Sequence, residues 1–174
     1  DVEDLMSLLK TRHAILLNAR KSKNPGEFKD KNNRAGNTEF VDFKLVRGTL
    51  VKGFDFYNAL DHPFAKAAYM MYLVSEVHPF LDGNGRIARV MMNAELVKHS
   101  QSKIIIPTVY REDYMGALRK LTRESNPAPF VRMLLRAREF SATIVGADIE
   151  QMQVLLEKSN AFLEPEKGKL KITV

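Results

Sequence analysis

The sequence feature that most constrains the fold is a short polar loop between two apolar segments. Residues 65–77 are almost entirely apolar, and residues 87–97 repeat apolar side chains at helical spacing. Between them lie Pro79, which disfavours α-helical geometry in the residue before it, and the range Gly83–Gly85, whose residues all tolerate positive φ angles. This pattern predicts two helices joined by a tightly curled loop.

The same loop carries residues suited to phosphate chemistry. A curled backbone at the start of a helix presents unpaired N–H groups at the positive end of the helix dipole, and such a site binds anions. Arg86 is predicted to begin the second helix, and Arg89 lies on the same face and leans towards the loop. Asp82 would be repelled by phosphate unless a cation such as Mg²⁺ lay between them. His78 can accept a proton from a hydroxyl, since the unperturbed pKa of histidine is about 6.5.

Each of these signals also has a structural interpretation. A Gly-Asn-Gly turn before a helix often binds nothing, and a single histidine is more often structural than catalytic. Together, a base, a carboxylate, an anion site and two arginines within twelve residues fit one phosphate-bearing substrate. The loop is therefore predicted to be a phosphoryl-transfer site.

The range His78–Arg89 reads His-Pro-Phe-Leu-Asp-Gly-Asn-Gly-Arg-Ile-Ala-Arg. It resembles, without departure, the signature His-Pro-Phe-x-Asp/Glu-Gly-Asn-Gly-Arg-x-x-Arg of the Fic family (filamentation induced by cAMP; Fic/Doc superfamily). The resemblance implies an all-α fold, a Fic-type helical domain with a small β-hairpin flap next to the active-site loop. It also implies transfer of AMP from ATP to a hydroxyl side chain of a target protein. Outside the signature the resemblance extends more loosely over residues 25–147, through the order of elements.

The resemblance assigns roles to residues of the loop. It makes His78 the general base and Asp82 the ligand of Mg²⁺, with ATP as co-substrate. Pro79 and Phe80 would be the structural anchor of the loop. The residues that would bind the nucleotide phosphates are Gly83, Asn84, Gly85, Arg86 and Arg89.

A β-hairpin is predicted upstream of the loop. In the range Thr38–Leu50, aromatic and β-branched residues alternate with polar ones. In Fic proteins a hairpin flap holds the target segment as an added strand, and this range resembles the flap in position and composition. An ordinary surface hairpin explains the residues equally well. The residues of the expected target-binding flap are Glu39, Phe40, Val41, Asp42, Phe43 and Lys44.

A second copy of the first three letters of the signature lies at His62-Pro63-Phe64. The glycines and arginines that follow in the signature are missing there, so this copy is not expected to bind phosphate. Asp61 is predicted to be the N-cap of the helix that leads to the loop, and Pro63 suits its first turn. His62 is therefore expected to have a structural role.

Further helices are predicted at residues 2–19, 111–123, 129–146 and 148–163. The chain is divided into an N-terminal helix (1–24), which starts at Asp1 as an excised fragment would, a Fic core domain (25–147), and a C-terminal helix with a solvated tail (148–174). The helix after the loop is expected to bury one set of residues, namely Ile87, Val90, Met91, Ala94, Leu96 and Val97.

Composition limits the alternatives. The net charge is +6, but basic residues are scattered among acidic ones without an aromatic–basic stripe, so nucleic-acid binding is a minor hypothesis. The absence of cysteine excludes disulfides and cysteine-ligated zinc. No apolar run is long enough to cross a bilayer and no secretory signal is present, so a cytoplasmic location is expected.

The sequence thus predicts a Mg²⁺-dependent protein adenylyltransferase that releases pyrophosphate. The related alternatives are Fic-type transfer of phosphate or phosphocholine, or removal of AMP, and Asp82 with intact Gly83 and Gly85 favours AMP transfer. Many Fic proteins carry an inhibitory helix, Ser/Thr-x-x-x-Glu-Gly/Asn, whose glutamate binds the second signature arginine, here Arg89. That pattern is not found in this sequence. An upstream inhibitory helix or an antitoxin-like partner is therefore expected to supply it.

Overall fold

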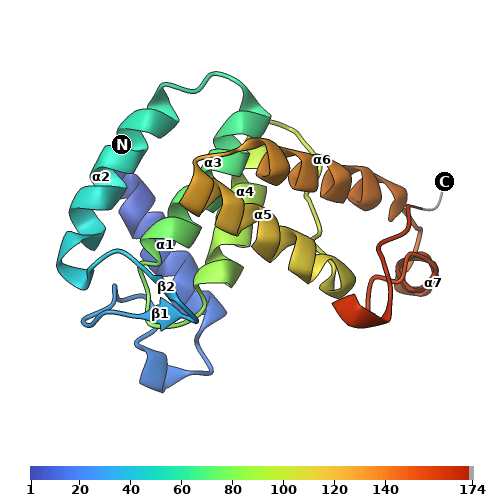
Figure 1. Cartoon of the computed structure of the whole chain (residues 1–174), viewed down its shortest axis with the longest axis horizontal. Coiled ribbons are helices and arrows are strands. Elements are labelled where there is room, and N and C mark those ends of the chain that lie inside the picture. The colour runs from blue at the N-terminus through green and yellow to red at the C-terminus, as the bar shows by residue number, and fades with distance from the viewer. Residues whose placement is uncertain (173–174) are drawn as a thin grey trace. The chain divides into compact units, whose positions relative to one another are not determined.

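The computed structural model describes residues 1–172 (Figure 1). The chain divides into two compact units, one from Asp1 to Gln101 and one from Ser102 onwards. Within the described residues, seven α-helices accompany one antiparallel sheet of two short strands. The predicted all-α fold with a small β-hairpin is confirmed. None of the helices in residues 1–172 has the length and apolar character needed to cross a membrane.

The first unit is built around the two helices that flank the loop. In chain order its elements are α1 (Val2–Leu16), η1 (Lys21–Lys23), β1 (Arg34–Ala35), β2 (Thr38–Glu39), η2 (Phe43–Leu45), α2 (Val46–Asn58), α3 (Pro63–Val77) and α4 (Asn84–Lys98). Helices α3 and α4 share the most extensive helix–helix contact, while α2 packs against α3 and α1 against α4. Because both central helices are covered in this way, the loop between them is held from several sides.

The start of α3 differs in one detail from the prediction. Its N-cap is His62 and not Asp61, since ring Nδ1 of His62 accepts a hydrogen bond of 3.2 Å from the N–H of Phe64. Pro63 occupies the first turn as predicted, where the missing N–H costs nothing. His62 therefore has the structural role that was expected of it.

The start and the buried face of α4 also needed correction. The helix begins at Asn84, two residues before Arg86, because Gly83 adopts a φ of 77° and ends the loop there. Val90 and Val97 were predicted to be buried but are 39% and 50% exposed. They lie two helical turns apart and so share one face of the helix, which is exposed to solvent. Four of the predicted set are not exposed: Ile87, Met91 and Leu96 are buried and Ala94 is half-buried.

The predicted hairpin at Thr38–Leu50 is wrong in its boundaries. The strands pair Arg34 with Glu39 and Ala35 with Thr38, so the hairpin turns earlier, at the Gly36-Asn37 dipeptide, which favours positive φ. Residues 40–42 have no regular secondary structure, and the rest of the predicted range forms η2 and the first turns of α2.

Helix α2 was missed because its β-branched and aromatic residues suggested a strand. Val46, Leu50, Gly53 and Tyr57 are buried at spacings of four, three and four residues, which is helical. Gly53 lies where α2 meets α3, and a Cβ there would clash with the side chain of Leu73. Tertiary packing has therefore overridden the local propensity.

The second unit contains the helices predicted for the C-terminal part of the chain. Its elements are η3 (Thr108–Tyr110), α5 (Arg111–Glu124), α6 (Ala128–Thr143), α7 (Ile149–Lys158) and η4 (Pro165–Lys167). Helices α5 and α6 pack against each other through buried side chains such as Tyr114 and Phe130. The tail was expected to be solvated, but Leu170 is buried and its carbonyl accepts a hydrogen bond of 3.2 Å from Arg136. The predicted domain boundaries at residues 25 and 147 stay a prediction.

Candidate active site

His78 directly follows the last residue of α3, which ends there because Pro79 disfavours α-helical geometry in the residue before it, and its backbone is left-handed with a φ of 50°. Ring Nδ1 lies 3.1 Å from the carbonyl oxygen of Ser75. Because a carbonyl only accepts hydrogen bonds, Nδ1 must carry the proton, which leaves the lone pair on Nε2. The ring of Phe40 stacks on the imidazole at 3.5 Å and 9°. His78 is thus held in one orientation with Nε2 able to accept a proton.

The charge state of His78 suits this role. Burial lowers the pKa of His78 to about 4, the hydrogen bond to Ser75 opposes that shift, and the nearby positive charge of Lys29 adds to it. The imidazole is therefore neutral at physiological pH, which a general base requires.

The loop behind His78 is closed by Phe80 and Asn84. Phe80 is fully buried, and both of its main-chain polar groups bind the side chain of Asn84: N–H to Oδ1 at 2.9 Å and carbonyl to Nδ2 at 2.8 Å. The Asn84 side chain is thereby occupied within the loop. The prediction that Asn84 binds phosphate consequently concerns its main-chain N–H group.

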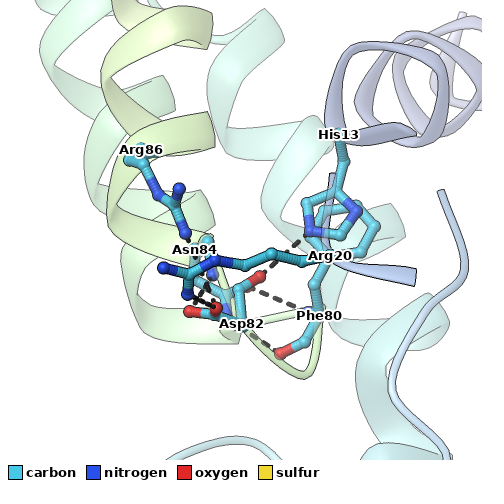
Figure 2. A network of polar contacts seen from close by, with 7 residues as sticks. His13, Arg20, Phe80, Asp82, Asn84 and Arg86 are labelled. Carbon is cyan, nitrogen blue, oxygen red and sulfur yellow. Dashed lines mark hydrogen bonds and ion pairs between the residues drawn. The ribbon is translucent and has the colours of Figure 1, made fainter. Parts of the chain in front are cut away.

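His13, in α1, supports the loop from the other side (Figure 2). Its ring stacks on Phe80 at 3.7 Å and 6°. Nε2 donates to the carbonyl of Asp82 at 3.0 Å, and Nδ1 accepts from the N–H of Gly26 at 3.0 Å. Burial lowers the pKa of His13, although the Asp82 carbonyl and carboxylate oppose that effect, and so the ring is held neutral. His13 was not among the predicted site residues, because its only signal in the sequence was a polar residue four positions from Leu9 on a buried helix face.

Asp82 lies between two guanidinium groups (Figure 2). Its Oδ2 is 2.9 Å from Nη1 of Arg20 and 3.6 Å from Nη2 of Arg86, and its Oδ1 accepts from the N–H of Gly83 at 2.6 Å. Burial by itself raises the pKa of Asp82, but the hydrogen bonds from Gly83 and Arg20 and the two positive charges outweigh it and lower the pKa overall. Asp82 is therefore a carboxylate. Arg20, like His13, was not among the predicted site residues.

The Asp82 carboxylate suits a metal ion whose other ligands come mainly from the phosphates of the substrate and from water. Within residues 1–172, no group of three or more His, Cys, Asp or Glu side chains is arranged around a common ion position. Mg²⁺ commonly takes one or two carboxylates and completes its shell with phosphate oxygens and water. The partly exposed, anionic Asp82 beside an anion site meets that requirement.

The anion site is the N-terminus of α4. The first helical hydrogen bond runs from the N–H of Ile87 to the carbonyl of Gly83 at 2.9 Å, so the N–H groups at positions 84–86 have no partner within the described part of the chain. Nη1 of Arg89 lies 3.6 Å from the position that a Cβ on Gly85 would take, so this side chain leans back over the helix start. Free main-chain donors and two arginines therefore converge at the end of the loop.

The predicted flap residues serve several purposes. Glu39 belongs to β2, and Phe40 packs on His78. Asp42 caps η2, since its Oδ1 accepts from the N–H of Lys44 at 2.9 Å. The range Val41–Lys44 is thus irregular chain and a 3₁₀ turn, and only the short hairpin before it offers strand edges.

Comparison with known proteins shows which family these features belong to. The model of the Fic/DOC family matches residues 5–96. A relative from Drosophila persimilis named protein adenylyltransferase Fic is 41% identical over 78 residues, which is 45% of this chain and 15% of the relative. A relative of the same name from Drosophila virilis is 40% identical over 103 residues, which is 57% of this chain and 21% of the relative. The chain thus spans only a small part of the curated relatives it matches.

Solved structures agree on the fold. Fic-1 (aa134–508) from C. elegans has a TM-score of 0.66 at 23% identity, covering 89% of this chain and 44% of that one. A Fic domain containing signaling protein from Bacteroides thetaiotaomicron has a TM-score of 0.65 at 20% identity, covering 91% and 64%. At these identities the likeness concerns the fold alone.

Proposed function

Because this chain belongs to the Fic/DOC family, we propose that it is a protein adenylyltransferase that transfers AMP from ATP to a Ser, Thr or Tyr hydroxyl of a target protein. The observation that carries the proposal is the neutral His78, with Nδ1–H bound to Ser75, at the loop that leads into the free N–H groups of α4. The name of the Drosophila relatives supports the same reaction.

In the proposed reaction, Nε2 of His78 takes the proton of the target hydroxyl. The resulting oxygen nucleophile attacks the α-phosphorus in line, and the bond from that phosphorus to pyrophosphate breaks. The N–H groups at positions 84–86 and the side chains of Arg86 and Arg89 neutralise the negative charge of the departing phosphates. Asp82 would hold Mg²⁺, which supplies further neutralisation of the phosphate charge when bound.

Some features of the expected partners belong to the proposal as well. A target would add a strand to the hairpin β1–β2, next to Phe40 and His78. The glutamate of an upstream inhibitory helix or an antitoxin-like partner would bind Arg89, which makes no ion pair or hydrogen bond with any described residue. A cytoplasmic location stays a prediction from the sequence.

Labelled ATP distinguishes the proposed reaction from its relatives. The purified chain is incubated with Mg²⁺ and cell lysate, using α-labelled and γ-labelled ATP in parallel. Transfer of the α-label alone to protein, lost in a His78→Ala variant, supports AMP transfer. Transfer of the γ-label indicates phosphate transfer, and release of AMP from a previously adenylylated protein indicates hydrolytic removal of AMP. Either of those two results would replace the proposed function.

A further inference from the structure

Lys29 is a buried cation that the proposed mechanism does not use. Its side chain is 3% exposed, and no carboxylate within residues 1–172 lies at ion-pair distance from its Nζ. A buried, unpaired ammonium group is costly, so its surroundings must compensate for the lost hydration. Burial lowers the pKa of Lys29, and the negative charge of Asp42 partly opposes that shift.

The hydrogen bonds of Lys29 all lead to the backbone around His78. Its own N–H donates to the carbonyl of Pro79 at 2.8 Å. Its Nζ donates to Oδ1 of Asn33 at 2.8 Å and lies 3.5 Å from the carbonyl of Val77. Nδ2 of Asn33 then donates to the carbonyl of Phe80 at 2.9 Å. Lys29 and Asn33 therefore bind the carbonyls on both sides of the catalytic histidine.

These contacts act on a strained residue. His78 has a φ of 50°, a conformation that non-glycine residues adopt only at a cost and that the surroundings must enforce. Its Nδ1–H reaches the Ser75 carbonyl only while this backbone geometry lasts. The main-chain carbonyl of Asn33 also accepts a hydrogen bond of 3.3 Å from the N–H of Phe40, whose ring stacks on His78. Lys29 and Asn33 thus hold both the backbone of His78 and the ring of Phe40 that stacks on it.

We propose that Lys29, acting with Asn33, is a positioning residue that fixes the backbone, tautomer and orientation of His78. The importance of this for AMP transfer rests on the proposed function, but its effect on the imidazole does not. The groups that act on the imidazole are the Lys29 ammonium, the Ser75 carbonyl and the apolar ring of Phe40, while Asp42 acts on Lys29.

Two variants separate the charge of Lys29 from the hydrogen bonds. Lys29→Met removes the ammonium group and keeps an unbranched side chain of similar length. Asn33→Ala removes the side-chain bonds to the Phe80 carbonyl and to Nζ of Lys29, and leaves the positive charge of Lys29 in place. Lys10→Met is the matched control, because Lys10 is a partly exposed lysine paired with Glu27 on the surface. The ring ¹⁵N resonances of His78, assigned by their loss in His78→Asn, report its tautomer and its pKa.

In both Lys29→Met and Asn33→Ala we expect the Nδ1–H population of His78 to fall at neutral pH. In Lys29→Met the pKa of His78 should also rise, because a nearby positive charge is removed. The melting temperature of Lys29→Met should stay the same or rise, since an apolar side chain replaces a buried unpaired charge. In AMP transfer, kcat should fall by about 10²-fold, because a small misplacement of a catalytic group has an effect of this size. KM for ATP should stay unchanged. Lys10→Met should behave as the wild type.

Unchanged His78 resonances in folded Lys29→Met and Asn33→Ala would overturn the inference. If Lys29→Met does not fold, Asn33→Ala decides by the same measurement. If the His78 resonances change as expected while the wild-type chain transfers no AMP, the proposed function fails and the positioning role stands.

Discussion

His78 should make the protein less stable in mild acid, although it is proposed to act in catalysis. Burial holds the pKa of His78 at about 4 in the folded chain, against an ordinary value of 6.5 for histidine. The unfolded chain therefore binds a proton that the folded chain does not. The contribution of neutral His78 to the unfolding free energy is fully present above about pH 6.5 and is lost as the pH falls towards about 4.

The size of this effect follows from the two pKa values. At pH 5 a shift from 6.5 to about 4 corresponds to about 2 kcal/mol of unfolding free energy. Because His78 is only half-buried, solvent screening reduces this to about 1–2 kcal/mol. At pH 7.5 both states are neutral at this position, so the effect there is negligible.

A His78→Asn variant tests the reasoning, since asparagine does not titrate and tolerates a positive φ. Urea unfolding is followed by circular dichroism at pH 7.5 and pH 5.0. The loss of unfolding free energy between the two should be about 1–2 kcal/mol smaller in the variant than in the wild type. An equal pH dependence in wild type and His78→Asn would refute a lowered pKa at His78.

Four further outcomes are expected. His13→Phe should retain the stacking but leave a buried N–H and a carbonyl unpaired, which lowers the unfolding free energy by about 1–3 kcal/mol in urea unfolding. Gly83→Ala should lower both stability and nucleotide affinity, because its Cβ would meet Leu17 at 2.7 Å with a φ of 77°; calorimetry measures both. Asp82→Ala should abolish the stimulation of transfer by Mg²⁺, and full wild-type transfer in excess chelator would contradict its role. Glu39→Pro, in β2, should impair modification of a target while ATP binding persists, so unimpaired modification would exclude strand addition there.

Much of the fold was predictable because helical periodicity is a local signal. The helices that were predicted begin or end within a few residues of the observed α1, α3, α5, α6 and α7. Helix α2 was missed because Thr49, Val51 and nearby aromatic residues have strand propensity, which packing against α3 outweighed. The hairpin was misplaced for the same reason, since the short pairing of Arg34 with Glu39 has no apolar alternation to reveal it.

The sequence by itself determined the loop, because all its key residues lie within the range His78–Arg89. Proline and glycine chemistry predicted that α3 ends before Pro79 and that a curled loop leads into a second helix, although that helix starts at Asn84 and not at the predicted Arg86.

Only the tertiary structure decided what holds the loop in place. His13 binds the Asp82 carbonyl from 69 residues away, Arg20 binds the Asp82 carboxylate from 62 residues away, and Asn33 binds Phe80 from 47 residues away. No local pattern marks these partners, because hydrogen bonds between distant segments exist only once packing has brought the segments together. The neutral state of His78 likewise depends on burial, which is a property of the folded chain and not of the residues next to it.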